Sequence, residues 1–365
     1  MNISDENSNR AEGLKILYFG FFNPSYPRNR VVIKGLKEAG VEVNILSNNS
    51  PGLLKYVGLA FEYLKLKKDF DFIIVGFPGH KAMFLARFLF RGKIIFDAFT
   101  SDYEGYILDR KKYKKGGLRE KYYRFLDKKS CQMANLVLLD TNAHVNFFIE
   151  QYNLTPNKFK VVPVGTDIEI FKPLKKAIDG REFTVFFHGN YIPLHGTSYI
   201  IKAAKLLEDK KIRFVILGRG QTYNNDRKLA EELGLSNIRF FGRVDYEDLP
   251  QYIAEADLCL GIFGDSSKVD RVIPNKVFEY MACQKPVLTA RTHAIKEMFR
   301  ENENIYLCNQ ADQNDLAMAI LNIMEDNDRD RIAENGNKII RSQASPLAIA
   351  RIIINALYEN RLLSK

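Results

Sequence analysis

Short apolar runs recur along the whole chain, and segments with helical spacing lie between them. In the first half the runs predict buried strands at residues 14–19, 41–46, 72–76, 93–96, 136–139 and 159–164. Between the first two runs, Val32, Leu36 and Ala39 recur at helical spacing, and Gly40 follows as a helix stop. Strand, helix and strand in this order predict a parallel sheet, because the crossover helix returns the chain to the same edge.

The second half repeats this alternation. Apolar runs predict strands at residues 184–187, 214–217, 238–241, 257–262 and 287–290, and helices are expected at 197–207, 275–281 and 346–363. A chain of 365 residues is longer than one core usually serves. We therefore expect an α/β protein with two doubly wound domains.

Composition narrows the class of protein. Hydrophobic residues make up 46% of the chain, which is typical of a globular protein. The four cysteines include no C-x-x-C pair, so we expect buried free thiols in a reducing cytoplasm and no zinc. No segment has the roughly eighteen uncharged apolar residues of a membrane span. The polar segment 1–13 is unlike a signal peptide and is expected to be a frayed tail.

The positive charge lies in the first half. Residues 1–165 hold 26 Lys or Arg against 16 Asp or Glu, whereas the remainder holds 28 of each. Nucleic acid, an anionic membrane surface or a phosphate-bearing acceptor could each explain this excess. Segment 109–130 has ten basic residues, three acids and interleaved aromatic residues, and segment 53–68 is similar. Since no nucleic-acid module accompanies the charge, we expect helices that lie on the inner face of the membrane.

The segment with the clearest chemistry is 271–287, RVIPNKVFEYMACQKPV. Pro274 can begin a helix, because its missing N–H costs nothing in the first turn. The free N–H groups and dipole of a helix N-terminus favour phosphate, and the carboxylate of Glu279 can accept hydrogen bonds from sugar hydroxyls. A helix N-terminus for the diphosphate and the Glu279 carboxylate for the ribose together suit a nucleotide sugar. The alternative is an amphipathic helix with a solvated Glu.

This segment resembles the donor-site signature of retaining glycosyltransferases of family 4, which have the GT-B fold. That signature has two Glu residues separated by seven others; Glu279 falls on the second, which holds the ribose, and Arg271 replaces the first. The turn with Gly165 and Asp167 resembles the inter-domain signature, and segment 188–196 resembles the glycine loop of the donor domain. The resemblance spans nearly the whole chain and implies two Rossmann-like domains facing a central cleft.

The domains implied are an acceptor-binding domain at 1–167, a nucleotide-sugar-binding domain at 168–345, with a linker at about 168–182, and a C-terminal helix at 346–365 that crosses back to the first domain. In the family an Arg and a Lys of the glycine loop clamp the donor diphosphate. Asn190 and His195 occupy those two places here. We infer that Arg271, with Lys276, restores part of the missing positive charge.

The site residues implied by the resemblance form three groups. The donor-binding residues are Gly189, Asn190, His195, Gly196, Arg219, Arg243, Val244, Pro274, Asn275, Lys276 and Glu279, the acceptor-side residues are Asn23, Ser25, Arg28, His80 and Asp102, and the catalytic residues are Asp97 and Arg271. Three alternatives stay open: Arg28 as a surface charge, Asp97 as a helix cap and His80 as a structural residue.

The function implied is transfer of a sugar from a nucleotide diphosphate sugar to an acceptor hydroxyl, with retention and without a metal or cofactor. The acceptor expected is a lipid-linked or glycan precursor at the membrane, and the partners are this acceptor, the nucleotide sugar and the anionic membrane surface. Two alternatives are a nucleotide-sugar epimerase and a non-catalytic binding protein. The sequence leaves the sugar, base, linkage and oligomeric state undetermined.

Overall fold

The computed structural model describes residues 13–66, 69–175 and 182–363, and the chain divides into two compact units. Unit 1 takes in the described residues of Met1–Ile107, Lys111–Asp167 and Gln343–Lys365, and unit 2 those of Leu108–Arg110 and Ile168–Ser342. Most of the tail expected at 1–13 and residues 176–181 of the expected linker lie outside the described residues.

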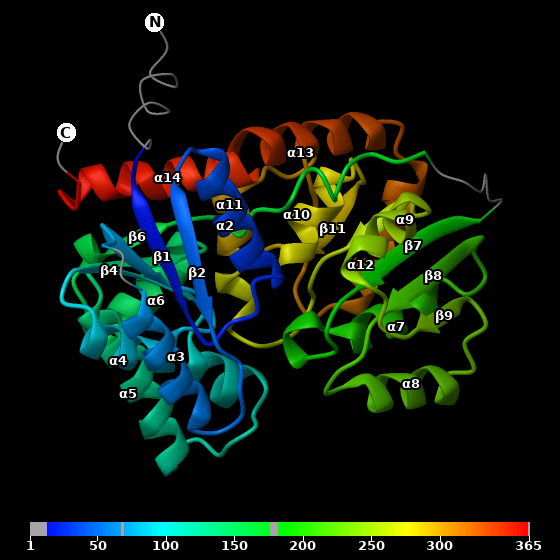
Figure 1. Ribbon diagram of the computed structural model, residues 1–365. Helices are drawn as coiled ribbons and strands as arrows, with labels where there is room; N and C mark the ends of the chain where they lie inside the picture. The colour runs from blue at the N-terminus through cyan, green and yellow to red at the C-terminus, as the bar shows by residue number, and fades with distance from the viewer. Residues whose placement is uncertain (1–12, 67–68, 176–181, 364–365) are drawn as a thin grey trace, which may run out of the picture. The chain divides into compact units, whose positions relative to one another are not determined.

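Unit 1 is built on a parallel six-stranded sheet in the order β2-β1-β3-β4-β5-β6 (Figure 1). The strands are β1 Lys15–Gly20, β2 Glu42–Ser47, β3 Phe72–Val75, β4 Lys93–Phe99, β5 Leu136–Leu139 and β6 Phe159–Val161. The helices are α2 Pro27–Glu38, α3 Leu54–Lys65, α4 His80–Leu89, the π-helix η1 Glu104–Asp109, α5 Leu118–Met133, α6 Asn142–Tyr152, the 3-10 helix η2 Pro156–Lys158 and α14 Pro346–Glu359.

The helices of unit 1 cover the two faces of its sheet. One core cluster joins α2 and α14 to the sheet through Val32, Leu36 and Ile353. The other cluster joins α3, α4, α5 and α6 to the opposite face, through residues such as Leu59 and Met83. Side chains of successive strand residues therefore enter opposite cores, as in a doubly wound fold.

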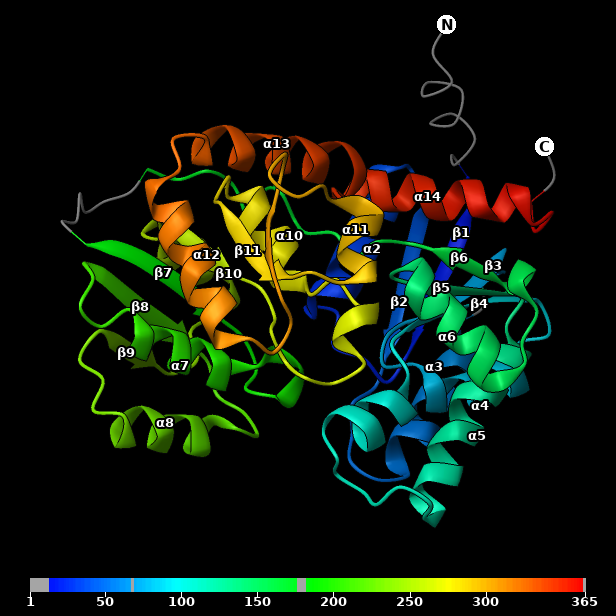
Figure 2. The same ribbon diagram turned by 180° about the vertical axis from the view of Figure 1, so that it is seen from behind.

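The last helix, α14, belongs to unit 1 although unit 2 precedes it in the chain (Figure 2). It packs closely on α2, where a Cβ added at Gly35 would stand 1.9 Å from the carbonyl oxygen of Pro346. Gly35 therefore allows the backbones of two helices to touch. Gly165, at φ +69°, makes the turn beside them, and a Cβ there would stand 2.7 Å from the Ala344 carbonyl oxygen.

Unit 2 repeats the architecture with a second parallel sheet, in the order β12-β11-β10-β7-β8-β9. Its strands are β7 Phe183–His188, β8 Ile212–Leu217, β9 Ile238–Phe241, β10 Leu258–Leu260, β11 Val287–Ala290 and β12 Tyr306–Cys308. Its helices are η3 Pro193–His195, α7 Thr197–Leu206, α8 Tyr223–Glu232, η4 Tyr246–Asp248, α9 Leu249–Ala254, η5 Val269–Arg271, α10 Asn275–Ala282, α11 His293–Met298, α12 Gln313–Glu325 and α13 Arg329–Gln343.

Several predicted element boundaries are wrong: the strand expected at 159–164 ends at Val161, the strand expected at 257–262 is Leu258–Leu260, and the helix expected at 346–363 ends at Glu359. Two further differences have a clear physical reason. The strand expected to end at Phe96 continues to Phe99, because the buried carboxylate of Asp97 is paired with a cation and no longer disfavours the interior. The basic helix expected over 109–130 begins only at Leu118, after a loop that contains Gly116 and Gly117. Within the described residues, no helix has the length and apolarity to cross a bilayer.

Candidate functional site

The N-terminus of α10 lies in unit 2, as the sequence indicates. Pro274 is the residue before the helix, in an extended conformation, and α10 runs from Asn275 to Ala282. Lys276 and Glu279 lie one turn apart on it, and both are buried. A helix N-terminus with a buried ammonium in its first turn can receive a phosphate group.

Lys276 lies against the glycine loop that follows β7. A Cβ built on Gly189 would stand 2.9 Å from both Lys276 Nζ and His195 Cε1, so the ammonium and the imidazole meet at this glycine. Lys276 Nζ has no hydrogen-bond partner among the residues that the structure describes, and it lies 4.3 Å from the centre of the Phe187 ring. A buried ammonium without a bonded acceptor is suited to an anionic ligand.

The glycine loop owes its shape to close backbone approaches. Gly196 has φ +65°, and a Cβ there would stand 2.4 Å from Gly264 N, while a Cβ at Gly218 would stand 2.0 Å from the Gly189 carbonyl oxygen. The 3-10 helix η3 ends at His195 and directs its ring inward, since only 8% of His195 is exposed. The loop therefore holds His195 and Lys276 together.

Glu279 is buried beside two further polar side chains. Its Oε1 accepts a hydrogen bond from the hydroxyl of Tyr246, and its Oε2 lies 3.0 Å from His188 Nε2. His188 is the last residue of β7, and Tyr246 comes from η4. A ribose that bound Glu279 would have to share or displace these contacts.

Burial shifts the protonation equilibria of this cluster. It raises the pKa of Glu279 to about 7, partly offset by the hydrogen bond from Tyr246 and the charge of Lys276. It also lowers the pKa of Lys276 to about 7, while the charge of Glu279 opposes that shift. Burial and the Lys276 charge lower the pKa of His188 to about 3 and that of His195 below its ordinary value. Both imidazoles are therefore neutral at pH 7.

The other predicted donor residues are more exposed. Asn190 and Arg243 are exposed, and Val244 is partly buried. Arg219 is exposed and stacks its guanidinium over the Tyr223 ring at 4.9 Å. Arg271, at the end of η5, donates a hydrogen bond to Ser267 Oγ at 2.9 Å. Lys276 is thus a buried cation at the glycine loop, and the roles predicted for the exposed residues stay predictions.

In unit 1, the predicted catalytic residue Asp97 forms a buried ion pair with Arg28. The Arg28 Nε atom lies 3.0 Å from Asp97 Oδ2, and neither side chain is exposed. Arg28 also donates to the carbonyl oxygens of Val162 and Pro163. The surface-charge alternative for Arg28 is therefore wrong. Direct contact of Asp97 with a substrate would require this pair to open, which leaves a buried charge unpaired.

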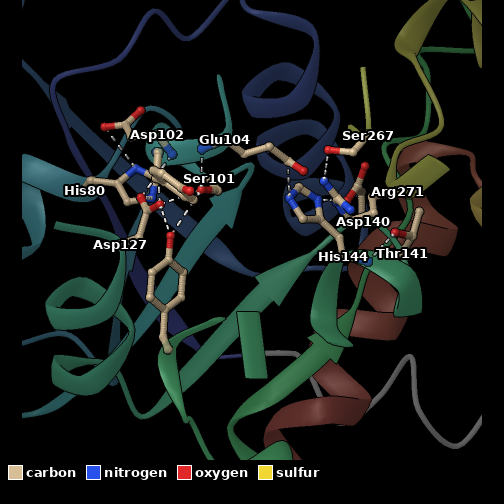
Figure 3. A network of polar contacts seen from close by, with 12 residues as sticks. His80, Ser101, Asp102, Glu104, Asp127, Asp140, Thr141, His144, Ser267 and Arg271 are labelled. Atoms are coloured by element: carbon tan, nitrogen blue, oxygen red, sulfur yellow. Dashed lines mark hydrogen bonds and ion pairs between the residues drawn. The ribbon is translucent and has the colours of Figure 1, made fainter. Parts of the chain in front are cut away.

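His80 and Asp102 lie in a polar network around Asp127 (Figure 3). His80 Nε2 is 3.2 Å from Asp127 Oδ1, and its Nδ1 is 3.8 Å from Asp102 Oδ2. These three side chains are spaced as metal ligands could be. However, the Asp127 carboxylate already accepts hydrogen bonds from Ser101 Oγ, Tyr152 OH and two backbone N–H groups. The arrangement favours a structural role for His80. Asn23 and Ser25 lie in the exposed turn after β1.

A second buried network surrounds His144 (Figure 3). Its Nδ1 lies 2.8 Å from Asp140 Oδ1 and its Nε2 3.3 Å from Glu104 Oε2. The two carboxylates outweigh the effect of burial and raise the pKa of His144 to about 9. The Thr141 hydroxyl accepts from His144 N and caps α6.

Sequence reasoning missed His144, His188, Asp127 and Tyr246. Two signals could have found the histidines. His188 is the first polar residue after a buried run, and His144 follows Asp140 by four residues at a helix start, where the two side chains face each other. Nothing in the local pattern identifies Tyr246 or Asp127, because their partners are distant in sequence.

Residues 169–339 match the family model of group 1 glycosyl transferases. Among curated proteins, the chain is similar to the MMP alpha-(1->4)-mannosyltransferase of Mycolicibacterium hassiacum, with 24% identity over 60% of this chain and 54% of the relative. It is also similar to a D-inositol 3-phosphate glycosyltransferase of a Mycobacterium species, with 26% identity over 51% of this chain and 44% of the relative. The chain thus spans about half the length of these curated relatives.

Two solved structures resemble 95% of the chain. HepE of Anabaena, in complex with UDP and glucose, has a TM-score of 0.73 at 18% identity, over 95% of this chain and 100% of that one. Sucrose-phosphate synthase from Thermosynechococcus elongatus has a TM-score of 0.76 at 17% identity, over 95% and 99%. At these identities the likeness shows the fold, which is the predicted GT-B fold of two Rossmann-like units.

Proposed function

We propose that the chain transfers a sugar from a nucleoside diphosphate sugar to an acceptor hydroxyl, with retention of anomeric configuration. The match of residues 169–339 to the family model of group 1 glycosyl transferases supports this proposal. The observation that carries the proposal is the Lys276 ammonium, buried without a hydrogen-bonded acceptor among the described residues, beside the glycine loop and the start of α10. A diphosphate supplies the missing negative charge.

Lys276 would act on the leaving group. As the bond from the sugar to the diphosphate breaks, negative charge grows on the diphosphate oxygens. An ammonium already fixed in a dry site stabilises that charge without reorganising water. The N–H groups at the start of α10 would add further donors. In the family, an Arg and a Lys of the glycine loop clamp the donor diphosphate, and Asn190 and His195 occupy their places here. Lys276 and the start of α10 would bind the diphosphate instead.

Two structures of one similar protein, HepE of Anabaena, support a nucleotide sugar as donor. The HepE structures contain UDP and glucose or UDP-glucose. We propose a hexose as the sugar, and a lipid-linked or glycan precursor at the membrane surface as the acceptor. The positive charge of unit 1 fits an anionic acceptor or the anionic surface that holds it.

The experiment is a thermal-shift screen of UDP- and GDP-sugars, followed by product analysis. We expect one nucleotide sugar to raise the melting temperature and to be hydrolysed slowly without acceptor, with release of nucleoside diphosphate. NMR of the transferred sugar should show the donor's anomeric configuration. Conversion to an epimeric nucleotide sugar without acceptor would identify an epimerase. Stabilisation with no released nucleotide, with or without acceptor, would identify a binding protein.

The ribose contact is tested by Glu279→Gln, which keeps the volume of the buried side chain and one acceptor oxygen. Loss of a charged hydrogen bond should weaken nucleotide binding by about 1.5–3 kcal/mol. Matched titrations with ribo- and 2′,3′-dideoxy-nucleotides provide the control. If Glu279 binds the hydroxyls, the dideoxy nucleotide binds both proteins equally; an equal loss for both nucleotides would contradict the assignment.

A further inference from the structure

The outer face of helix α3 is apolar. Only Leu59 of its twelve residues is buried. On the opposite side, Leu54, Val57, Phe61 and Leu64 recur at spacings of three, four and three and are 69%, 67%, 58% and 72% exposed. A surface helix normally turns such a stripe toward the core. In α3 the stripe faces away from it.

Helices α4 and α5 continue this apolar surface. Phe84 and Phe88 of α4 are 36% and 84% exposed, and Leu118 and Phe125 of α5 are 84% and 50% exposed. The rings of Phe84 and Phe125 stack at 6.1 Å, which joins the two helices. Single exposed apolar residues are ordinary, but stripes on three neighbouring helices indicate an interaction surface.

The three stripes face the same way because the helices share one layer. Leu59 of α3, Met83 of α4 and Cys131 of α5 enter the same core cluster against one face of the sheet. The sides opposite these residues must point away from the sheet. Figure 1 shows α3, α4 and α5 grouped on that side of unit 1. We call the exposed side chains of these helices the outer helical face.

The charge of the outer helical face is strongly positive. The three helices carry nine Lys or Arg against three acids, and one of the acids, Asp127, is fully buried. Lys65 Nζ lies 4.1 Å from the centre of the Phe61 ring, and Lys81 Nζ lies 6.0 Å from that of Tyr122. Ammonium groups therefore flank the aromatic side chains, with long stems that can lie along an apolar surface.

We propose that the outer helical face lies on an anionic lipid bilayer, with the α3 stripe inserted at the boundary of headgroups and acyl chains. Lysine and charge are depleted at the core of protein–protein interfaces. Interfacial helices instead combine an apolar face with Lys and Arg that contact anionic headgroups. The membrane contact would hold the chain where a lipid-linked acceptor is found, and only this role rests on the proposed function.

Insertion differs from attraction by charge alone. The lysines at positions 111, 112, 114 and 115 lie in the exposed loop before α5 and could attract the same lipids. Their contribution is screened by salt within a Debye length of about 8 Å at physiological ionic strength. Burial of the α3 side chains persists when the charges are screened.

The test is co-sedimentation with vesicles of phosphatidylcholine plus phosphatidylserine and of phosphatidylcholine alone. The wild-type protein should sediment with the anionic vesicles, and a residual part should stay bound at high salt. The double variant Val57→Ser/Phe61→Ser should lose roughly tenfold or more of its vesicle partition, because two apolar side chains no longer leave water. Met318→Ser provides the matched control, since Met318 is 60% exposed on α12 of unit 2.

Three results would overturn the proposal. One is vesicle binding equal in the double variant and the wild-type protein. Another is binding removed entirely by Gln at positions 111, 112, 114 and 115, which would make it a charge effect. The third is a wild-type dimer that the double variant converts to monomer in light scattering, which would assign the face to a second copy. Nucleotide-sugar binding and hydrolysis are measured in the same variants without lipid, so failure here is separate from failure of the proposed function.

Discussion

Lys276 carries a buried ammonium that has no hydrogen-bonded acceptor among the described residues, and an anionic ligand would supply one. Lys276→Met keeps the length and apolar stem of the side chain but removes the ammonium. We expect affinity for the nucleoside diphosphate to fall by about 1.5–3 kcal/mol, the range for charged hydrogen bonds, and affinity for the nucleoside to stay nearly unchanged. Isothermal titration with both ligands measures the difference.

Lys296→Met is the control for that variant. Lys296 is an exposed lysine of α11, and its loss should change neither affinity. Arg271→Ala, measured in the same way, tests whether the arginine shares the diphosphate. Equal losses of nucleoside and diphosphate affinity in Lys276→Met would show that Lys276 does not face the phosphates.

The opposed pKa shifts of Glu279 and Lys276 predict an unusual pH dependence without ligand. The folded-state pKa of Glu279 is raised to about 7, so the folded state binds more protons and stability falls as pH rises toward 7. The folded-state pKa of Lys276 is lowered to about 7, so the unfolded state binds more protons above pH 7 and stability rises again. The cluster's contribution to stability is therefore smallest near neutrality.

Denaturant titrations across this pH range measure the effect. The double variant Glu279→Gln/Lys276→Met should show a flatter stability profile between pH 5 and 9 than the wild-type protein. A saturating nucleoside diphosphate should also raise the stability near pH 7 and so remove this minimum, because the anion favours protonated Lys276. Parallel profiles for the double variant and the wild-type protein would contradict the assignment.

Part of the candidate site could be predicted from local pattern. Pro274, Lys276 and Glu279 stand in one short segment whose helix start the sequence reveals. Asp97 and Arg28 are different, because they are 69 residues apart and nothing local indicates that they pair. An Asp after an apolar run, such as Asp97, fits a site residue and a helix cap equally well. Only the folded structure shows that Arg28 is its partner.

At the scale of elements, the contact of α2 with α14 depends on one missing side chain. Gly35→Ala would place a methyl group 1.9 Å from the carbonyl oxygen of Pro346, so the helices must separate. We expect a loss of about 1–3 kcal/mol in the free energy of unfolding, as for an overpacked core. Alanine's higher helix propensity offsets only about 1 kcal/mol of this.

Gly117→Ala is the control, since its new methyl group has as its nearest neighbour the Lys114 carbonyl oxygen at 3.4 Å. Urea unfolding followed by circular dichroism compares the variants. Equal stability of Gly35→Ala and the wild-type protein would show that α14 docks less closely than the structure has it.

Element ends were harder to predict than elements. The apolar runs predict most strands, but they do not predict β12 at Tyr306–Cys308, since three residues give little periodicity. The π-helix η1 at Glu104–Asp109 has no sequence signal of its own. It begins where the Asp127 carboxylate accepts from the backbone N–H groups of Asp102 and Tyr103.

At the scale of the molecule, two units with separate cores predict a local response to donor. A bound nucleoside diphosphate stabilises the unit that binds it by mass action. Hydrogen exchange should therefore slow at residues 188–196 and 274–282, while the amides of β1 and β3 in unit 1 exchange as before. Mass spectrometry of peptides with and without UDP or GDP measures this. Equal protection in both units would contradict a donor site confined to unit 2.

The return of α14 to unit 1 also sets an order of events during synthesis. At about 5–20 residues per second, the ribosome makes α14 on the order of tens of seconds after α2, once all of unit 2 has been made. Through that interval Val32, Leu36 and their neighbours lack Ile349 and Ile353, the residues that complete their core. Unit 2 can therefore finish folding first. Unit 1 is made earlier, but its apolar core residues stay exposed until α14 is made, and chaperones can shield that surface.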